Sequence, residues 1–410
     1  MHRCLFLLLL LLPLPANGEP FRKVLISSKE NLRLDSLEVT GKEITPKCAV
    51  PWSVRKQTLH GGKQEGVDIV VIDNGKFEIS VVPTRGMGIL SLKAGQLRLG
   101  WDSPVTDVVH PKFVNLNGRG GLGWLDGFNE WMCRCGLESA GGPGPDKFIN
   151  NIGDEATMDL TLHGKIANLP AQFVELSVDR EAPYAIHLKG TVDEKMLFGP
   201  KLELATELII VPGAASFRLE DTVINRGTQP QEFEMIYHTN FGTPLLEKGA
   251  VFMAPLKRVS PFNERAAKGI GTWNRYAAPT SGFIEQVYLL EPLANEAGNT
   301  LLLLRDAAAE RGATLRYSIK ELPCLTLWKN TGALADGYVT GLEPGTNYPN
   351  HRSIERKQGR LQKIPGGGQQ RMTIDFGVLT SKEEVSEAAR QITAIQGKIS
   401  PTIDKEPPAR

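Results

Sequence analysis

Short runs of alternating apolar and polar residues recur along most of the chain, and Gly, Pro or Asn residues separate them. A period of two is typical of β-strands that bury one face, and no helical pattern separates these runs. The first two runs, in 67–83, are divided by an Asp-Asn-Gly turn, which predicts a β-hairpin. Later runs include FVELSV, LELATELIIV, SFRLEDTVINR, QEFEMIYH, NTLLLLR and MTIDFGVL. We therefore predict a mostly β protein built as an antiparallel sandwich.

The one clear helical pattern lies near the C-terminus. Residues 381–395 (SKEEVSEAARQITAI) have the apolar spacing of a helix. Ser381 is a favourable N-cap, and Glu384 stands three residues later as its capping-box partner. The polar residues that follow, 396–410, predict a disordered tail.

The chain begins MHRCLFLLLLLLPLPANGEP, which has the three parts of a secretory signal. Positive residues precede an apolar run, and the small residues Ala16 and Gly18 suit a cleavage site. The apolar run is too short to span a bilayer and is interrupted by Pro13 and Pro15. We therefore expect residues 1–18 to be a signal peptide that exports the protein to the periplasm or the extracellular space, with no membrane anchor.

Charge and cysteine content limit the expected partners and the expected kind of fold. The net charge is only +1, from 47 basic and 46 acidic residues spread along the chain. Nucleic acids and anionic membranes bind clustered basic residues, so we expect neither as a partner. Outside the signal the cysteines are too few for a disulfide scaffold in so long a chain, although export permits a disulfide. They are Cys48, Cys133, Cys135 and Cys324.

A glycine-rich segment, NGRGGLGWLDGFNEWMCRCGLESAGGPGPDK (117–147), interrupts the strand pattern. It carries Trp124, Trp131 and several carboxylates and amides. We predict a long loop here, because such loops in a sandwich usually bind ligands or cover a site. Aromatic faces beside carboxylates and amides are also the groups that bind sugars.

Four other segments place a chemically active residue beside Gly or Pro at the end of a predicted strand. They are VVPTRGMGI with Arg85, LTLHGKIANLPA with His163, EMIYHTNFGTPLLEKGA with His238, and GLEPGTNYPNHR with Glu343. Each residue alone has a structural interpretation, as a surface charge, a core histidine bonded to a carbonyl or a turn residue. A carboxylate in so stiff a loop is equally suited to act as a positioned base.

Three of these segments resemble motifs of one family. LHGKIANLPA is similar to the His-Gly motif of aldose 1-epimerases, the galactose mutarotase-like family, and YHTNFGTPLL and GLEPGTNYPN resemble its second histidine motif and its glutamate motif. PTRGM, with Arg85, is similar to the family's upstream arginine motif. The motifs follow the family's order, and the resemblance defines a domain at 67–380, preceded by an extension at 19–66. It implies the mutarotase super-sandwich, in agreement with the strand pattern.

The resemblance also implies a reaction. Mutarotation opens a cyclic hemiacetal, for which one group takes the proton of the C1 hydroxyl and another protonates the ring oxygen. The family assigns the base to Glu343 and the acid to His238, which we expect on opposite sides of the sugar. His163 and Arg85 would hold ring hydroxyls.

Three further residues complete the predicted substrate site. Asn240 lies in the same motif as His238. Glu285, in IEQVYLLEP, is interpreted either as a hydroxyl contact or as a cross-strand charge. Trp328, in LTLWKN, is interpreted either as a stacking platform for the sugar or as a core residue.

Three functions stay open at this level. The first is acid–base interconversion at the anomeric carbon of an aldose, with a small carbohydrate as the only partner and no cofactor or metal. The second is a carbohydrate lyase, hydratase or isomerase that acts on a keto-sugar or glycoside, with a metal held by His163, His238 and Glu343 as a minority alternative. The third is a sugar-binding protein without catalysis. The sequence leaves the oligomeric state open.

Overall fold

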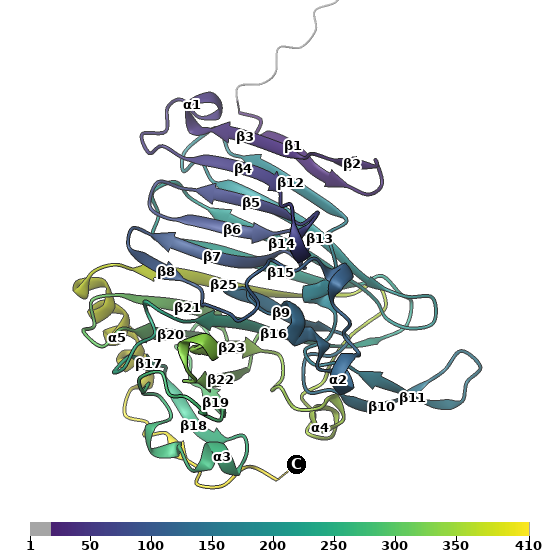
Figure 1. The fold of residues 1–410 in the computed structure, drawn as a ribbon, viewed down its shortest axis with the longest axis vertical. Helices are drawn as coiled ribbons and strands as arrows, with labels where there is room; N and C mark the ends of the chain where they lie inside the picture. The colour runs from purple at the N-terminus through teal and green to yellow at the C-terminus, as the bar shows by residue number, and fades with distance from the viewer. Residues whose placement is uncertain (1–17, 410) are drawn as a thin grey trace, which may run out of the picture.

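The computed structural model describes residues 18–409 and shows a mostly β fold with two large sheets (Figure 1). The alternating pattern of the sequence is therefore confirmed as antiparallel strands, and only the pairing of β18 with β26 is parallel among the named strands of this range. The predicted signal peptide lies outside the described residues, apart from Gly18.

The first sheet has ten strands. In spatial order they are β17 (Val251–Met253), β20 (Asn299–Arg305), β21 (Gly312–Ser318), β25 (Gln369–Leu379), β15 (Ser216–Asn225), β14 (Lys201–Ile210), β13 (Ile186–Lys195), β12 (Phe173–Val178), β1 (Phe21–Ser27) and β2 (Leu32–Arg33). The long strands β13, β14 and β15 alternate buried and partly exposed residues, as expected for strands with one face on the core.

The second sheet has fourteen strands and carries the candidate site. In order they are β26 (Thr402–Ile403), β18 (Leu256–Pro261), β19 (Gln286–Pro292), β22 (Cys324–Asn330), β23 (Val339–Gly345), β16 (Gln231–Phe241), β9 (Met132–Leu137), β7 (Gly88–Ala94), β6 (Glu78–Val82), β5 (Asp68–Asp73), β4 (Ser53–Thr58) and β3 (Ser36–Thr40), with β24 (Gln362–Ile364) on β16 and β8 (Leu97–Leu99) on β7. β5 and β6 form the hairpin predicted at 67–83.

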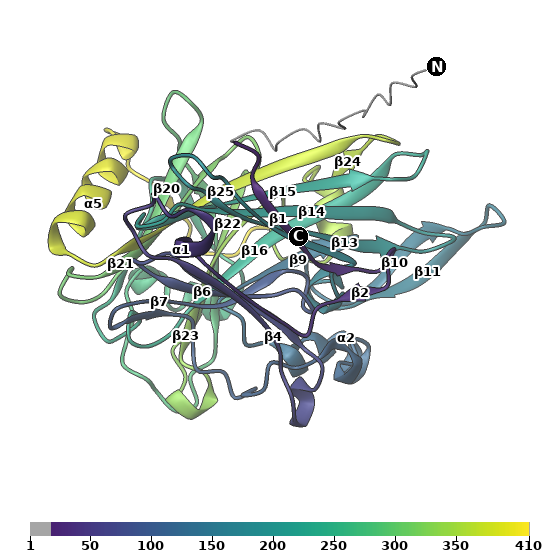
Figure 2. The same ribbon diagram turned by 90° about the horizontal axis from the view of Figure 1, so that it is seen from above.

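One continuous apolar core lies between the two sheets. It joins residues such as Leu204 and Leu219 of the first sheet with Ile79 and Ile89 of the second. Burying one such side chain fully contributes about 2 kcal/mol, so this core is the main source of stability. Figure 2 shows the sheets from above, with the separate hairpin β10 (Gly144–Ile149) and β11 (Glu155–Leu160) projecting from the body.

A buried charge pair crosses this core. Arg134 of β9 donates to Asp221 of β15 over 2.9 Å, and both side chains are fully buried. Arg134 also donates to Thr206 of β14, and the Tyr237 hydroxyl donates to Asp221. Because each polar atom of the pair has a partner, the two sheets are tied together directly beneath the strands of the candidate site.

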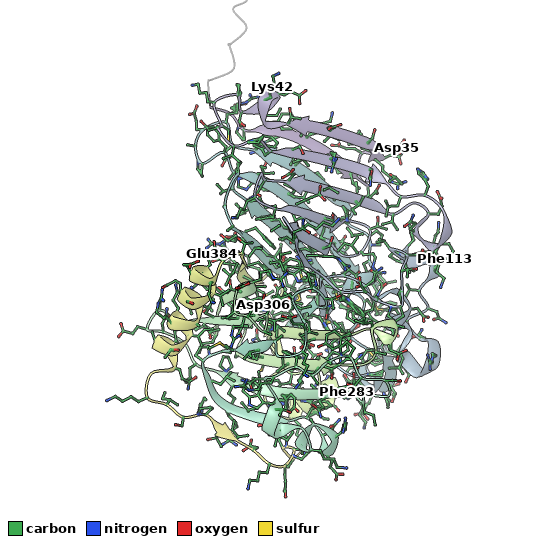
Figure 3. The ribbon with its side chains drawn as sticks, turned by 60° about the vertical axis from the view of Figure 1, so that its left-hand side comes forward. Asp35, Lys42, Phe113, Phe283, Asp306 and Glu384 are labelled. Atoms are coloured by element: carbon green, nitrogen blue, oxygen red, sulfur yellow. The ribbon has the colours of Figure 1, made fainter. Side chains whose placement is uncertain are left out.

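The helices are short except for the last one. They are α1 (Gly41–Ile44), α2 (Gly118–Gly121), α3 (Glu264–Ala267), α4 (Arg352–Lys357) and α5 (Lys382–Gln396), with 3₁₀ turns at 62–64, 111–113, 123–127, 166–168, 270–272 and 334–336. α5 has the predicted capping box, in which Ser381 and Glu384 bond each other's backbone N–H. Figure 3 places Glu384 at the start of α5, distant from Lys42 on α1. Of the helices in residues 18–409, none is both long and apolar enough to cross a membrane.

The extension predicted at 19–66 is built into the sandwich, because β1 and β2 extend the first sheet and β3 and β4 extend the second. The prediction of a disordered tail is wrong. The tail is ordered, because β26 pairs with β18 and Asp404 forms an ion pair with Arg258 at 2.9 Å. The polar composition of the tail predicted disorder because an isolated polar segment buries too little apolar surface to fold. The edge of the second sheet supplies backbone hydrogen-bond partners for the tail, and composition does not reveal them.

The glycine-rich segment also differs from its prediction as one long loop. Residues 132–137 form β9, a fully buried strand between β7 and β16. The sequence did not predict this buried strand because it contains Arg134, and a charged residue is expected in a protein interior only when it is paired. Cys133 and Cys135 are buried, and the thiols of the four cysteines in residues 18–409 are free.

Candidate active site

Three neighbouring strands of the second sheet build the candidate site. β23 lies between β16 and β22, and the register sets Gly341 opposite both Asn240 and Trp328. Residues two apart in a strand lie on the same face of the sheet. His238 of β16 and Glu343 of β23 therefore point to the same face as Asn240 and Trp328. Gly341 is at the centre, where a Cβ atom would lie 2.6 Å from Glu343 Oε1 and 3.2 Å from His238 Cε1. Only glycine leaves room for the two functional side chains.

His238 and Glu343 touch each other. His238 Nε2 lies 3.2 Å from Glu343 Oε1, and the two residues are only 5% and 3% exposed. The other ring nitrogen, Nδ1, is 2.7 Å from Asn240 Oδ1. The two predicted catalytic residues therefore meet, but the expectation that they flank a sugar on opposite sides is wrong. They stand side by side.

His163 approaches the same group from a loop. Its ring centroid lies 5.4 Å from that of His238, and its Nδ1 lies 2.9 Å from the carbonyl oxygen of Ala140. The backbone of His163 has φ 58°, a left-handed conformation uncommon for a residue with a side chain. The N–H of Gly136 donates to the His163 carbonyl and holds this turn in place. The loop thus presents the imidazole to the cluster.

Aromatic rings surround the histidines. The ring centroid of Phe128 lies 5.2 Å from that of His238 and 6.1 Å from that of Trp328. The ring centroids of Trp124 and His163 are 4.7 Å apart. Trp328 itself is 5.4 Å from His238. Neither Phe128 nor Trp124 was predicted as a site residue, although both belong to the glycine-rich segment, whose aromatic content was the available signal. Such walls suit the apolar C–H face of a sugar ring.

Glu285 and Trp328 lie at the exposed edge of the cluster. The Trp328 indole N–H donates to Glu285 Oε2 over 2.7 Å. Glu285 is exposed, and Trp328 is half-buried and packs against the buried cluster that includes Phe128. The contact joins β22 to the residue just before β19. A carboxylate accepts several hydrogen bonds, so the predicted hydroxyl-binding role of Glu285 stays a prediction.

Arg85 is the predicted residue that the structure places differently. Its side chain is fully buried in an ion pair with Glu130 and donates to Asn168 Oδ1 over 3.0 Å. A Cβ atom at Gly127 would lie 2.7 Å from Arg85 Nη1, so the guanidinium packs beneath the loop that carries Phe128. Arg85 therefore supports the aromatic loop, and the described contacts give no evidence that it binds a sugar hydroxyl.

Burial sets the protonation of the cluster. Removal from water, together with the charge of Glu285, raises the pKa of Glu343 to about 8. Removal from water also lowers the pKa of His163 to about 4, and burial and the neighbouring His163 hold the pKa of His238 well below its usual range. At neutral pH both imidazoles are thus uncharged, and one proton lies between Glu343 Oε1 and His238 Nε2.

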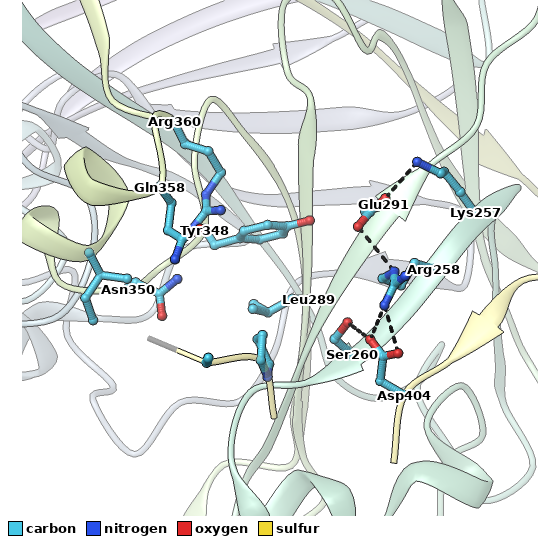
Figure 4. A pocket seen from close by; sticks show the side chains of 13 residues that line it. Lys257, Arg258, Ser260, Leu289, Glu291, Tyr348, Asn350, Gln358, Arg360 and Asp404 are labelled. Atoms are coloured by element: carbon cyan, nitrogen blue, oxygen red, sulfur yellow. Dashed lines mark hydrogen bonds and ion pairs between the residues drawn. The ribbon is translucent and has the colours of Figure 1, made fainter. Parts of the chain in front are cut away.

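Other parts of the structure offer cavities without such a group. One of about 310 Å³ is lined by the C-terminal tail, Tyr348 and Arg360, and there Arg258 is paired with Asp404 (Figure 4). Another of about 960 Å³ lies beside the β10–β11 hairpin, where Arg356 is paired with Asp146. Within residues 18–409, no group of three or more His, Cys, Asp or Glu side chains has the spacing of a metal site.

Comparison with solved structures identifies the fold. A crystal structure of a candidate aldose 1-epimerase from Klebsiella pneumoniae is 39% identical, covers 96% of this chain and 100% of its own, and superposes with a TM-score of 0.90. A galactose mutarotase-like protein from Clostridium acetobutylicum (13% identity, 80% and 98% covered) and a galactose mutarotase related enzyme from Lactobacillus acidophilus (12%, 77% and 98%) both have a TM-score of 0.52. The last two show the fold alone.

These likenesses and the two-sheet architecture define a protein with the galactose mutarotase-like fold, so the resemblance inferred from the sequence motifs is confirmed. The chain belongs to the family described as Domain of unknown function (DUF4432), whose model matches residues 64–378. No curated protein matches the chain in sequence.

Proposed function

We propose that the protein is a carbohydrate-active isomerase that interconverts the anomers of an aldose by acid–base catalysis. The contact between His238 Nε2 and Glu343 Oε1, at 3.2 Å, carries this proposal because it holds a proton donor and a proton acceptor side by side. The 39% identical Klebsiella pneumoniae protein, a candidate aldose 1-epimerase, supports it.

The side-by-side arrangement suits the chemistry of a hemiacetal. The C1 hydroxyl and the ring oxygen are bonded to the same carbon, so a donor and an acceptor on one side can reach both. In ring opening, the Glu343 carboxyl protonates the ring oxygen, the C1–O5 bond breaks, and His238 Nε2 takes the proton of the C1 hydroxyl, which becomes the aldehyde oxygen.

Ring closure reverses these transfers. The oxygen of the C5 hydroxyl attacks either face of C1, and the Glu343 carboxylate takes the proton of that hydroxyl. The His238 imidazolium protonates the aldehyde oxygen. The family resemblance implies the opposite roles in ring opening, with Glu343 as the base for the C1 hydroxyl and His238 as the acid for the ring oxygen. The raised pKa of Glu343 and the lowered pKa of His238 support the assignment proposed here. Rotation about C1–C2 before closure yields the other anomer, and both side chains return to their starting states.

The other residues of the cluster bind and orient the sugar in this proposal. Trp328 and Phe128 offer aromatic faces for C–H groups, and Glu285 accepts hydrogen bonds from hydroxyls at the exposed edge. His163, neutral over the working pH range, uses its free Nε2 for a hydroxyl. Burial of His238 and Glu343 strengthens their interaction with developing charge.

The test follows a pure anomer by polarimetry and NMR, with wild-type protein and with the Glu343→Gln variant. We expect the wild type to accelerate equilibration and the variant to lose about 10²- to 10⁴-fold, the usual contribution of one positioned acid–base group. Glu321→Gln is the matched control, because Glu321 is a partly buried carboxyl that accepts from the Thr373 N–H of β25, in the other sheet. It should keep full activity.

The same NMR spectra separate the alternatives if they are recorded with keto-sugars and glycosides, with and without EDTA. A new product formed without anomeric acceleration would assign the cluster to a lyase, hydratase or isomerase reaction. Binding of a sugar without any turnover would leave a sugar-binding protein. Either result would refute the proposed reaction.

We also propose that the protein is exported by residues 1–18. The apolar run between positive residues and a small-residue cleavage site supports this. Mass spectrometry of the mature N-terminus after cell fractionation tests it, and a full-length chain retained in the cytoplasm would refute it.

A further inference from the structure

We propose that Asn240 is a positioning residue that selects the tautomer of His238, in place of the substrate-binding role that its sequence motif predicts. The inference rests on the proposed function only for its effect on turnover. The tautomer itself is a property of the free protein.

The orientation of the Asn240 amide is determined by its surroundings. Asn240 is fully buried on β16, and its Nδ2 donates to the carbonyl oxygens of Glu130, at 3.1 Å, and of His238, at 3.2 Å. A carbonyl oxygen only accepts, so the NH₂ group must face these two atoms. The Asn240 carbonyl oxygen therefore faces His238 Nδ1.

The position of that oxygen determines which ring nitrogen carries hydrogen. Asn240 Oδ1 only accepts, and it lies 2.7 Å from His238 Nδ1, so Nδ1 must donate. In the neutral imidazole the other nitrogen, Nε2, then has a lone pair. It is this nitrogen that faces Glu343 Oε1. Asn240 thus directs the proton-accepting atom of His238 toward the place where proton transfer occurs.

The support of Asn240 extends one layer further out. Glu130, whose carbonyl holds the Asn240 amide, forms the buried ion pair with Arg85. The backbone N–H of Asn240 donates to the Trp131 carbonyl. Arg85 therefore has a supporting role in this proposal. Its ion pair anchors Glu130, the Glu130 carbonyl orients the Asn240 amide, and that amide orients the His238 ring.

The choice of asparagine also controls charge. The titratable groups that face His238 are Glu343 from β23, His163 from its loop and the Cys133 thiol of β9, whose Sγ lies 4.0 Å from the His238 carbonyl. An amide at position 240 accepts a hydrogen bond without adding charge. A carboxylate there would keep the hydrogen bond but would favour the imidazolium, which moves the shared proton from Glu343 to His238.

The experiment compares wild type, Asn240→Ala and Asn240→Asp by NMR of ¹⁵N-histidine-labelled protein, which distinguishes the two ring nitrogens. We expect neutral His238 to carry hydrogen on Nδ1 in the wild type and in Asn240→Asp. In Asn240→Ala the acceptor at Nδ1 is lost, and we expect the hydrogen on Nε2, where it can be donated to an oxygen of the Glu343 carboxyl. Asn240→Asp should also raise the pH at which the ring titrates.

Kinetics provide the second readout. Loss of an orienting group beside a catalytic histidine lowers kcat by about tenfold to 10⁴-fold with little change in KM, and we expect this for Asn240→Ala. Asn240→Asp should recover much of the loss and shift the pH profile to higher pH. Asn225→Ala is the control, because buried Asn225 donates to the Gln229 carbonyl and does not touch a histidine. It should leave the His238 spectrum unchanged.

Two results would overturn the inference. One is a wild-type His238 that carries hydrogen on Nε2 in its neutral form, which needs no variant to observe. The other is an Asn240→Ala protein that keeps both the Nδ1 hydrogen and the wild-type kcat. If no sugar is turned over, the proposed reaction fails while the spectra still decide the role of Asn240.

Discussion

Glu343→Gln is expected to make the protein more stable at neutral pH while it lowers the proposed activity by about 10²- to 10⁴-fold. In the folded protein Glu343 keeps its proton up to about pH 8, whereas in the unfolded chain it loses that proton near its ordinary pKa of 4.5. Between these values the unfolded chain binds fewer protons than the folded protein. The free energy of unfolding therefore falls as pH rises.

The size of this effect follows from the two pKa values. One pKa unit is equivalent to about 1.36 kcal/mol, so the interval from 4.5 to about 8 corresponds to about 5 kcal/mol above pH 8 and about 3 kcal/mol at pH 7. These figures are upper limits, because water that enters the site on ionisation, and a proton shared with His238, both reduce the cost. The Glu343→Gln variant would have no such cost, since the glutamine amide can donate to His238 Nε2 as the carboxylic acid does.

The assay is urea unfolding of wild type and Glu343→Gln from about pH 4.5 to about pH 8.5, a range that spans the two pKa values. The stability difference should be near zero or slightly unfavourable to the variant at the acidic end and should grow in its favour as pH rises. Glu296→Gln is the control, since the Glu296 carboxylate is exposed to water between β19 and β20 and is not among the groups that shift the pKa of Glu343. A difference that stays constant across this range would show that Glu343 ionises normally and would refute the protonation state on which the proposed mechanism depends.

Three other substitutions test the surroundings of the cluster. Asp221→Asn should lower the free energy of unfolding by about 3 to 5 kcal/mol in urea, because it leaves the Arg134 charge buried without its partner. Trp328→Phe should raise KM by about tenfold with kcat nearly unchanged, because it keeps a ring but loses the indole N–H. Asp404→Asn should increase proteolysis of the tail while changing global stability by less than about 1 kcal/mol, because its ion pair with Arg258 is partly exposed. Asp375→Asn is the matched control for Asp221→Asn, because its pair with Arg218 is partly exposed and should contribute less than about 1 kcal/mol. Equal losses in these two variants would refute the role of the buried pair. A large fall in kcat for Trp328→Phe would assign the indole to the chemical step, and an unchanged cleavage rate for Asp404→Asn would show that the strand pairing of β26 alone holds the tail.

Regular local signals predicted much of the fold. The period of two along the strands, the Asp-Asn-Gly turn in 67–83 and the capping box at Ser381 each depend on residues close in sequence, and the structure shows the expected elements at each place. The errors share one cause. β9 and β26 are strands because neighbours distant in sequence pair with them, and Arg134 is buried because Asp221 stands across the core.

The candidate site was likewise predicted only in part from the sequence. Its motifs indicated His163, His238 and Glu343, and the structure brings all three together. The sequence indicated that the aromatic residues of 117–147 suit sugar binding, but it did not single out Phe128, because that segment has no periodicity to indicate the direction of a side chain. Arg85 was misplaced for a related reason, since its partner Glu130 is 45 residues away along the chain.

The sequence by itself determined the strand-rich architecture, the family and the types of side chain available for proton transfer. Only the tertiary structure decided that His238 and Glu343 stand side by side, that burial suppresses their ionisation, and that Asn240 lies against the ring of His238. The physical reason is that hydrogen-bond direction and removal from water arise where separate strands and loops meet, and no single segment of chain contains that information.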